Sequence, residues 1–387
     1  MKAILKLLAL FSFIALIGLT SCDKDDDTSD DPLTATEAKD EIAKANDEII
    51  GNFESMMATD GMQSTMFLMF DLNMAGIENT LKSSYQAINP KNILMLSTNP
   101  KKAEFMTPVR VKENGGFMEP GIYEYDFTLD DFVKVSEHPQ DLITVYFPAS
   151  QIAYNAEDNN AIADVTALEL TTFSFYDDYE GVYYDEDVPT LIEMNIEIEG
   201  NLVFDLEYAG SFILSNDEQD LIPQSISVSA SLIPYDISVS WTGSNRNYSA
   251  LASIKLDSDI IASVDLDAEL TEYLFDEAPE LLSGHIQVTP LKAEGDMHFY
   301  NVEQAANQDP PDIDLMNENI NVDLIHVELN SKLGSLAAKS FVDDQGESID
   351  PILIFEDDSW ETLEVLFEDL ITYFEENFGS LFPTNEE

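Results

Sequence analysis

The sequence is poor in cysteine and in basic residues. It has one cysteine in 387 residues, which excludes an internal disulfide and a metal site built from several cysteines. Lys and Arg number 17 against 76 Asp and Glu, a formal net charge of −59. Because binding a polyphosphate requires cationic side chains, this charge argues against nucleic acid as a partner. The chain is still 44% hydrophobic, which is enough for a packed core.

Sequence motifs of common enzyme classes are also missing. There is no phosphate-binding loop, dinucleotide fingerprint, nucleophile elbow or HExxH zinc motif. The histidines stand in no clear ligand motif: His138, His285, His298 and His326. Acidic residues are so frequent that carboxylate pairs of the kind that hydrolyse glycosides arise by chance. We therefore assign no catalytic residue from the sequence.

The single cysteine follows a signal-like N-terminal segment. Lys2 and Lys6 introduce an apolar run over residues 7–19, too short for a comfortable membrane span. The run ends in Leu19, Thr20, Ser21 and Cys22, and this ending resembles the lipobox of bacterial lipoproteins. The resemblance implies a signal peptide over residues 1–21, a diacylglycerol thioether on Cys22 and an acyl chain, such as palmitate, on its amine.

An acidic stretch follows the cysteine and begins with Asp23, Lys24, Asp25, Asp26 and Asp27. It resembles the export tag of surface-exposed lipoproteins of the Bacteroidota, and the whole resemblance covers about residues 1–31. It implies an outer membrane lipoprotein that faces the cell exterior, bound to the membrane through its lipid. An extended, solvated tether over residues 22–33 is the plainer interpretation of the same charges, and both can hold.

Hydrophobic periodicity predicts helices at both ends of the remaining chain. Apolar residues at helical spacing, after a capping box at Thr34–Glu37, predict a helical hairpin within residues 34–81. A last amphipathic helix is predicted over residues 358–380, capped by Asp358 or Ser359.

Between the helices the apolar period changes to two. The alternation predicts mostly β-structure over residues 121–330, with Gly200-Asn201 as a hairpin turn. One wet face on each strand favours an antiparallel, curved meander over a parallel sheet. We therefore expect a single α+β domain over residues 34–387, with helices covering one face of the sheet.

Two clusters of oxygen-bearing side chains leave calcium open as a ligand, and no other cofactor is implied. The first comprises Asp309, Asp312, Asp314, Asn317, Asn319, Asn321 and Asp323. The second comprises Asp177, Asp178, Glu180, Asp185, Glu186 and Asp187. Neither has the order of an EF-hand loop, and a solvated acidic loop is the alternative at both.

Two further segments have an unusual composition. Six of the 13 methionines lie between Met56 and Met74. They either pack as core or line a pocket for an apolar ligand between the helices and the sheet.

Residues 82–112 hold six bases and one acid. These bases either pair with the acidic body or face anionic lipid or glycan.

The sequence therefore predicts a lipid-anchored, non-enzymatic protein of the cell envelope with a binding or structural role. One alternative is a carrier or sensor of an apolar ligand held beside the Met-rich helices. Another is a hydrolase that acts on glycan through dispersed carboxylates. An envelope protein, a glycan or an apolar molecule would be the partner, and the oligomeric state is left open.

Overall fold

The computed structural model describes residues 33–68, 72, 119–177, 182–214, 221–244, 247–269, 280–343 and 346–378. Contacts divide the chain into two compact units. The terminal unit is Met1–Glu54 with Asp259–Glu387, and the central unit is Ser55–Ser258. The lipobox and export-tag residues, Met69, Met74 and the basic segment 82–112 lie outside the described residues. The single domain over residues 34–387 stays a prediction.

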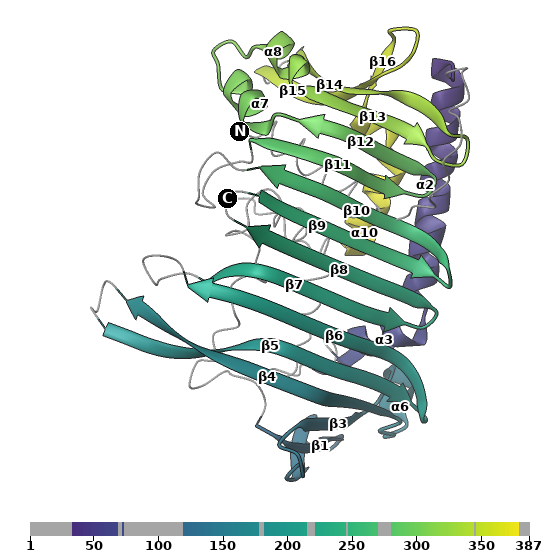
Figure 1. Cartoon of the computed structure of the whole chain (residues 1–387). Helices are drawn as coiled ribbons and strands as arrows, with labels where there is room; N and C mark the ends of the chain where they lie inside the picture. The colour runs from purple at the N-terminus through teal and green to yellow at the C-terminus, as the bar shows by residue number, and fades with distance from the viewer. Residues whose placement is uncertain are drawn as a thin grey trace. The chain divides into compact units, whose positions relative to one another are not determined.

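The central unit is a meander in which sequence neighbours pair antiparallel, except that β3 pairs with β1 and not with β2 (Figure 1). Its order is β9-β8-β7-β6-β5-β4-β3-β1-β2, with one parallel pair, β1 and β3. The strands are β1 (Gly121–Asp126), β2 (Asp131–Ser136), β3 (Ile143–Phe147), β4 (Ala161–Asp177), β5 (Val182–Ile198), β6 (Asn201–Leu214), β7 (Leu221–Leu232), β8 (Tyr235–Ser244) and β9 (Asn247–Leu256). Its helices are α3 (Asp60–Met66) and α6 (Gln151–Asn155).

The terminal unit is a second antiparallel meander, in the order β16-β15-β14-β13-β12-β11-β10. Its strands are β10 (Asp259–Glu269), β11 (Leu281–Val288), β12 (Leu291–Met297), β13 (Ile320–His326), β14 (Ser331–Asp343), β15 (Gly346–Ile354) and β16 (Trp360–Thr362). Its helices are most of α2 (Ala35–Met57), then α7 (Phe299–Ala306), α8 (Ile313–Glu318), α9 (Leu363–Leu366) and α10 (Glu368–Phe378). The predicted α+β class and antiparallel meander are confirmed.

The strands of each unit have an inner face, where apolar side chains are buried, and an outer face, where polar side chains meet water. On β8, Ile237, Val239 and Trp241 are buried, and the side chains between them are exposed or half-buried. This is the expected consequence of period-two alternation in a strand with one wet side. The outer faces therefore carry the side chains that are free to meet a partner.

The hairpin predicted at Gly200-Asn201 is present, but its turn lies one residue earlier. Ile198 pairs with Asn201, so the two turn residues are Glu199 (φ 52°) and Gly200 (φ 78°). A two-residue turn that matches the strand twist requires positive φ at both positions. Asn201 is instead the first residue of β6.

Helix α2 begins at the predicted capping box. The Thr34 N–H and hydroxyl donate to Glu37 Oε2 at 3.0 and 2.7 Å, and the Glu37 N–H donates to Thr34 Oγ1 at 3.4 Å. The predicted apolar stripe is buried, with Ile42, Ala45 and Ile49 at most 2% exposed. Together they confirm both the start and the buried face of this helix.

Two of the four described methionines of the Met-rich segment pack in the core, and Met57 and Met66 are half-buried. Met56 and Met62 are 7% and 9% exposed. Helix α3 also approaches the sheet closely at Gly61, where an added Cβ would overlap the Val203 carbonyl. These contacts within the central unit fit the packing interpretation of the Met-rich segment.

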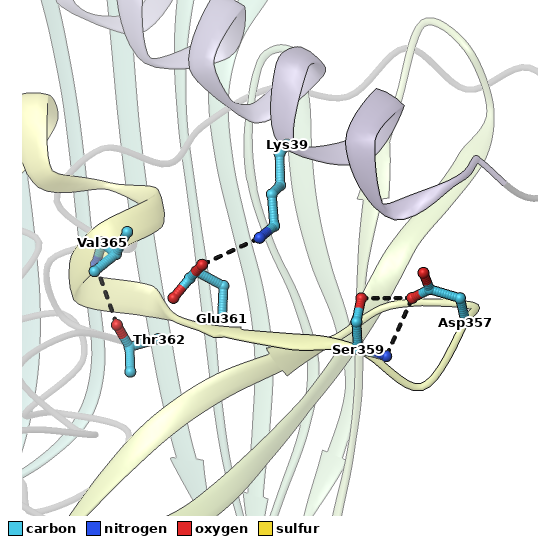
Figure 2. Close-up of polar contacts among 6 residues, drawn as sticks. All are labelled: Lys39, Asp357, Ser359, Glu361, Thr362 and Val365. Atoms are coloured by element: carbon cyan, nitrogen blue, oxygen red, sulfur yellow. Dashed lines mark hydrogen bonds and ion pairs between the residues drawn. The ribbon is translucent and has the colours of Figure 1, made fainter.

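The C-terminal helix begins later than predicted. Asp358 has a positive φ of 60°, and the Phe355 N–H donates to the Ser359 carbonyl at 2.8 Å, which closes a turn between β15 and β16. Thr362 then caps α9, its hydroxyl accepting from the Val365 N–H at 3.4 Å (Figure 2). A cap at Asp358 or Ser359 is therefore wrong, because residues 360–362 pair with β15 as a short strand.

Candidate functional site

The outer face of the terminal unit carries a continuous row of side chains, which we call the His285 row. Its members stand directly opposite one another on successive strands: Asp265, His285, Glu294, Asp323 and Ser335. Beyond Ser335 the register continues through Ile354 to Trp360 on the edge strand β16. Strands lie about 4.8 Å apart, so the row from His285 to Trp360 is about 24 Å long.

Two lysines on the neighbouring register line pair with carboxylates of this row. Lys292 Nζ lies 2.6 Å from Glu294 Oε2, and Lys332 Nζ lies 2.7 Å from Asp323 Oδ1. The Ser335 hydroxyl also donates to Asp323 Oδ1, at 2.9 Å. Because these lysines and carboxylates are partly exposed, each pair contributes little to stability. Their charged groups can therefore exchange a partner on the protein for one on a ligand.

His285 is the titratable base of the row. Its Nε2 lies 3.4 Å from Ser263 Oγ, with donor and acceptor set by the ring tautomer. Burial lowers the pKa of His285, and the Lys292 ammonium lowers it further. The imidazole is therefore neutral at neutral pH and offers one donor and one acceptor nitrogen.

The Ser263–His285 contact resembles a nucleophile and its base, but the surroundings do not suit acyl transfer. Ser263 lies within β10 and pairs with Gln287 of β11, so the backbone around it is used in the strand ladder. An oxyanion site needs N–H groups that point at the developing charge. The pair is better suited to binding polar groups.

The outer face of the central unit is lined by small hydroxyl groups. Glu207, Ser229, Ser238 and Ser253 form one row across β6–β9. The Ser238 and Ser253 hydroxyls are 2.7 Å apart, and the Ser231 hydroxyl donates to Asp236 Oδ1 at 2.9 Å. This face offers hydroxyls and carboxylates with few cations, unlike the His285 row.

Several residues suggested for calcium have other hydrogen-bond partners, and Asp178 and Glu180 lie outside the described residues. Asp185 accepts from Ser174 at 2.5 Å and Asp187 from Thr172 at 2.6 Å. In the other cluster, Asp312 Oδ1 caps α8 by accepting from the Leu315 N–H at 3.0 Å. Asn317 is bonded in both directions to the backbone of Ala338. Within the described residues, no group of three or more His, Cys, Asp or Glu is arranged to hold a metal ion.

Trp241 forms an aromatic cluster on the inner face of the central unit. Its ring is 1% exposed and stacks on Tyr248, with centroids 5.1 Å apart and planes 26° apart. Both rings fold over Gly243, where an added Cβ would lie 2.6 Å from each of them. Burial raises the pKa of Tyr248 to about 12. Among the residues that the structure describes, buried Trp241 Nε1 has no hydrogen-bond partner, which leaves an unsatisfied donor on an apolar face.

A second aromatic cluster ties the β1–β2 turn to α6. Asp130 Oδ1 accepts from the Tyr125 hydroxyl at 2.5 Å and from the Tyr154 hydroxyl at 2.6 Å. The rings of Phe127 and Phe132 pack edge-on against Tyr125. These hydrogen bonds lower the pKa of Asp130 and keep it charged. The cluster fixes local structure and leaves little of the shared carboxylate for a ligand.

Two of the remaining histidines accept hydrogen bonds from backbone N–H groups, and the third precedes a helix. His138 Nδ1 accepts from the N–H groups of Gln140 and Leu142, each at 3.2 Å. His326 Nδ1 accepts from the Leu329 N–H at 3.3 Å, and its Nε2 lies 3.7 Å from Glu41 Oε2. His298 precedes α7. Sequence reasoning did not find the neighbours of His285, because they come from other strands and only the strand register sets which residues lie opposite it.

Comparison with protein-family models, with curated proteins and with solved structures gives no match. In the part of the chain that the structure describes, no helix combines the length and apolar character needed to cross a membrane.

Proposed function

We propose that this protein is a lipid-anchored cell-envelope protein, displayed on the outer membrane, whose His285 row binds a polyhydroxylated ligand such as a glycan. The observation that carries the binding role is a register line of polar side chains, with His285 between Asp265 and Glu294, that lies beside the lysines of the neighbouring line. Sugar hydroxyls both donate and accept hydrogen bonds, so a surface that offers carboxylates, an imidazole, a hydroxyl and neighbouring ammonium groups suits them. The lipobox resemblance at Cys22 supports the location.

A binding experiment tests the glycan. The mature chain with Cys22→Ser is titrated with a panel of neutral and acidic polysaccharides, and heat of binding is measured. We expect the double variant His285→Ala/Lys292→Ala to bind at least tenfold more weakly. Ser238→Ala, on the outer face of the central unit, is the matched control and should leave binding unchanged. Absence of binding to every polysaccharide would contradict the proposal.

The anchor is tested separately at Cys22. Cells fed an alkyne-labelled palmitate should label the wild-type chain, and Cys22→Ala should lose both the label and membrane association. Protease added to intact cells should degrade the wild-type chain if it faces outward. A labelled protein that resists protease would place the folded part on the periplasmic side.

A second candidate function is a carrier of an apolar ligand, and the unpartnered Trp241 N–H favours it. An unsatisfied buried donor costs about 1–3 kcal/mol, which a ligand carbonyl or carboxylate would recover. Trp360→Phe leaves Trp241 as the only fluorescent tryptophan. Titration with a long-chain fatty acid should then change its emission, and an alkane of equal length should have less effect. No response to either would remove this candidate.

A further inference from the structure

Trp360 is an exposed tryptophan on an edge strand. It is 39% exposed and lies in β16, at the end of the register line that runs from His285 through Ser335. A large aromatic ring left in water at the edge of a polar surface is a common feature of binding sites. Its position on the outer face makes it available to whatever occupies the row.

The ring of Trp360 is held in one orientation by its neighbours. Lys339 Nζ lies 4.3 Å from the ring centroid, within the range of a cation–π contact. The Phe341 ring packs against it edge-on, with centroids 5.6 Å apart and planes 65° apart. A ring fixed in this way loses little conformational entropy when a ligand stacks on it.

The residues before and after Trp360, Ser359 and Glu361, are held by the contacts that Figure 2 draws. Ser359 donates to Asp357 Oδ1 through its N–H at 3.1 Å and through its hydroxyl. On the other side, Glu361 accepts from Lys39 Nζ of α2 at 3.1 Å. Lys39 also lies 5.2 Å from the centroid of the Phe355 ring. A three-residue strand would otherwise be a loose edge, and these contacts position it.

We propose that Trp360 is the aromatic subsite of the glycan surface, where the apolar C–H face of one sugar ring stacks while the hydroxyls of further sugars bind along the His285 row. This inference rests on the proposed function and names its ligand class. The row is about 24 Å long, several times the width of one sugar ring. The ligand is therefore an oligosaccharide, and a monosaccharide covers only one end of the site.

The charge of the edge selects among oligosaccharides. Glu356, Asp357 and Asp358 form the turn before Trp360, and Lys339 is the cation beside the ring. Like charges repel at short range, and exposed charges are screened by salt. A neutral oligosaccharide therefore binds best, and a polyuronic acid binds worse unless salt is raised.

Single-tryptophan variants test the inference. The chain has two tryptophans, so Trp241→Phe leaves Trp360 as the reporter and Trp360→Phe leaves Trp241. The probe is a neutral polysaccharide that binds the Cys22→Ser chain by calorimetry, together with its oligosaccharides of one to six units. We expect binding to change the emission of Trp360, to leave that of Trp241 unchanged and to strengthen with length up to about five units.

Further variants give the size of the effect. Trp360→Ala should weaken binding about tenfold to a hundredfold, and Trp360→Phe should retain part of it. Val365→Ala, an exposed apolar residue of α9, is the matched control and should bind like wild type. Unchanged circular dichroism of each variant shows that the fold is intact.

The outcomes separate this inference from the proposed function. If polysaccharide binds but Trp360 emission and the Trp360→Ala affinity are unchanged, the aromatic subsite is wrong and the glycan role stands. If a monosaccharide binds as tightly as the longest oligosaccharide, the extended site is wrong. If no polysaccharide binds at all, the proposed function itself fails.

Discussion

The two tryptophans occupy opposite kinds of environment. Trp241 of the central unit is 1% exposed on an inner face, stacked on Tyr248 and with an unpartnered N–H. Trp360 of the terminal unit is 39% exposed on an outer face, under the ammonium of Lys339. The same side chain thus contributes core packing at one site and is left partly exposed at the surface at the other. The difference follows from which face of a strand each residue occupies.

The largest expected effect is on stability. Trp241→Ala removes a fully buried ring and should lower the free energy of unfolding by about 3–5 kcal/mol. Trp360→Ala should lower it by less than about 1 kcal/mol, because surface substitutions rarely cost more. Urea unfolding followed by circular dichroism measures both. Equal losses would show that Trp360 is also a packing residue.

Gly243→Ala should disturb the packing of Trp241 and leave Trp360 unaffected. The added Cβ forces the Trp241 and Tyr248 rings apart, at a cost of about 1–3 kcal/mol. Gly51→Ala in α2 is the matched control, since nothing lies within 4 Å of its added Cβ and helix propensity favours Ala by about 1 kcal/mol. Thermal melts should move in opposite directions for the two variants. A stabilising Gly243→Ala would contradict the stacked geometry.

Tyr248, which stacks on Trp241, should lose its proton at a higher pH than an exposed tyrosine. The pKa of Tyr248 is raised to about 12 in the folded chain, against about 10 when unfolded. The folded state then holds a proton that the unfolded state loses, so stability falls as pH rises from about 10 to 12. In Trp360→Phe, quenching of Trp241 by the Tyr248 phenolate should have its midpoint near pH 12. Tyr248→Phe should abolish that step.

Acid should act on the unit that contains Trp360. Burial lowers the pKa of His326, although the neighbouring Glu41 carboxylate acts in the opposite direction. The unfolded chain therefore takes up a proton first, and stability falls as pH decreases below about 6.5. Trp360 emission in Trp241→Phe should report this loss, and His326→Gln should flatten it. A profile unchanged by His326→Gln would assign the acid response to carboxylates.

The smallest effect is expected at the Lys39–Glu361 ion pair. Both side chains are partly exposed, so Lys39→Met should cost no more than about 1 kcal/mol. It should nevertheless loosen β16 and increase quenching of Trp360 by iodide, while quenching of Trp241 stays the same. Lys44→Met, which removes a pair within α2 itself, is the control and should change neither.

Strands in which apolar and polar residues alternate regularly were predictable from the sequence, and strands with small or mixed residues were not. The sequence indicated β8 and β10 from their regular apolar positions, but it did not indicate β14. That strand contains Gly334 and the pair Ala337-Ala338, which favour strands weakly. Pairing with β13 and β15 makes this segment a strand. The Asn317 side chain also accepts from the Ala338 N–H and donates to its carbonyl. Tertiary pairing overrides local preference here.

The candidate site, too, was only partly predictable from the sequence. The isolated histidines and two tryptophans were visible as residues, but their neighbours were not. His285 lies 20 residues after Asp265 and 75 before Trp360 in the chain, and only register places the three on one line. Slipping one strand by a single residue would move its whole outer face inward.

The amino-acid pattern alone determined the signal-like N-terminus, the α+β class, the capping box of α2 and the two-faced strands. These depend on local chemistry and on periods of two or 3.6 residues, which a single sequence displays. The tertiary structure alone decided the His285 row, the cation above Trp360, the unpartnered donor of Trp241 and the late start of the last helix. Each of these requires strands far apart in sequence to meet in a defined register, and that register is a property of the folded chain.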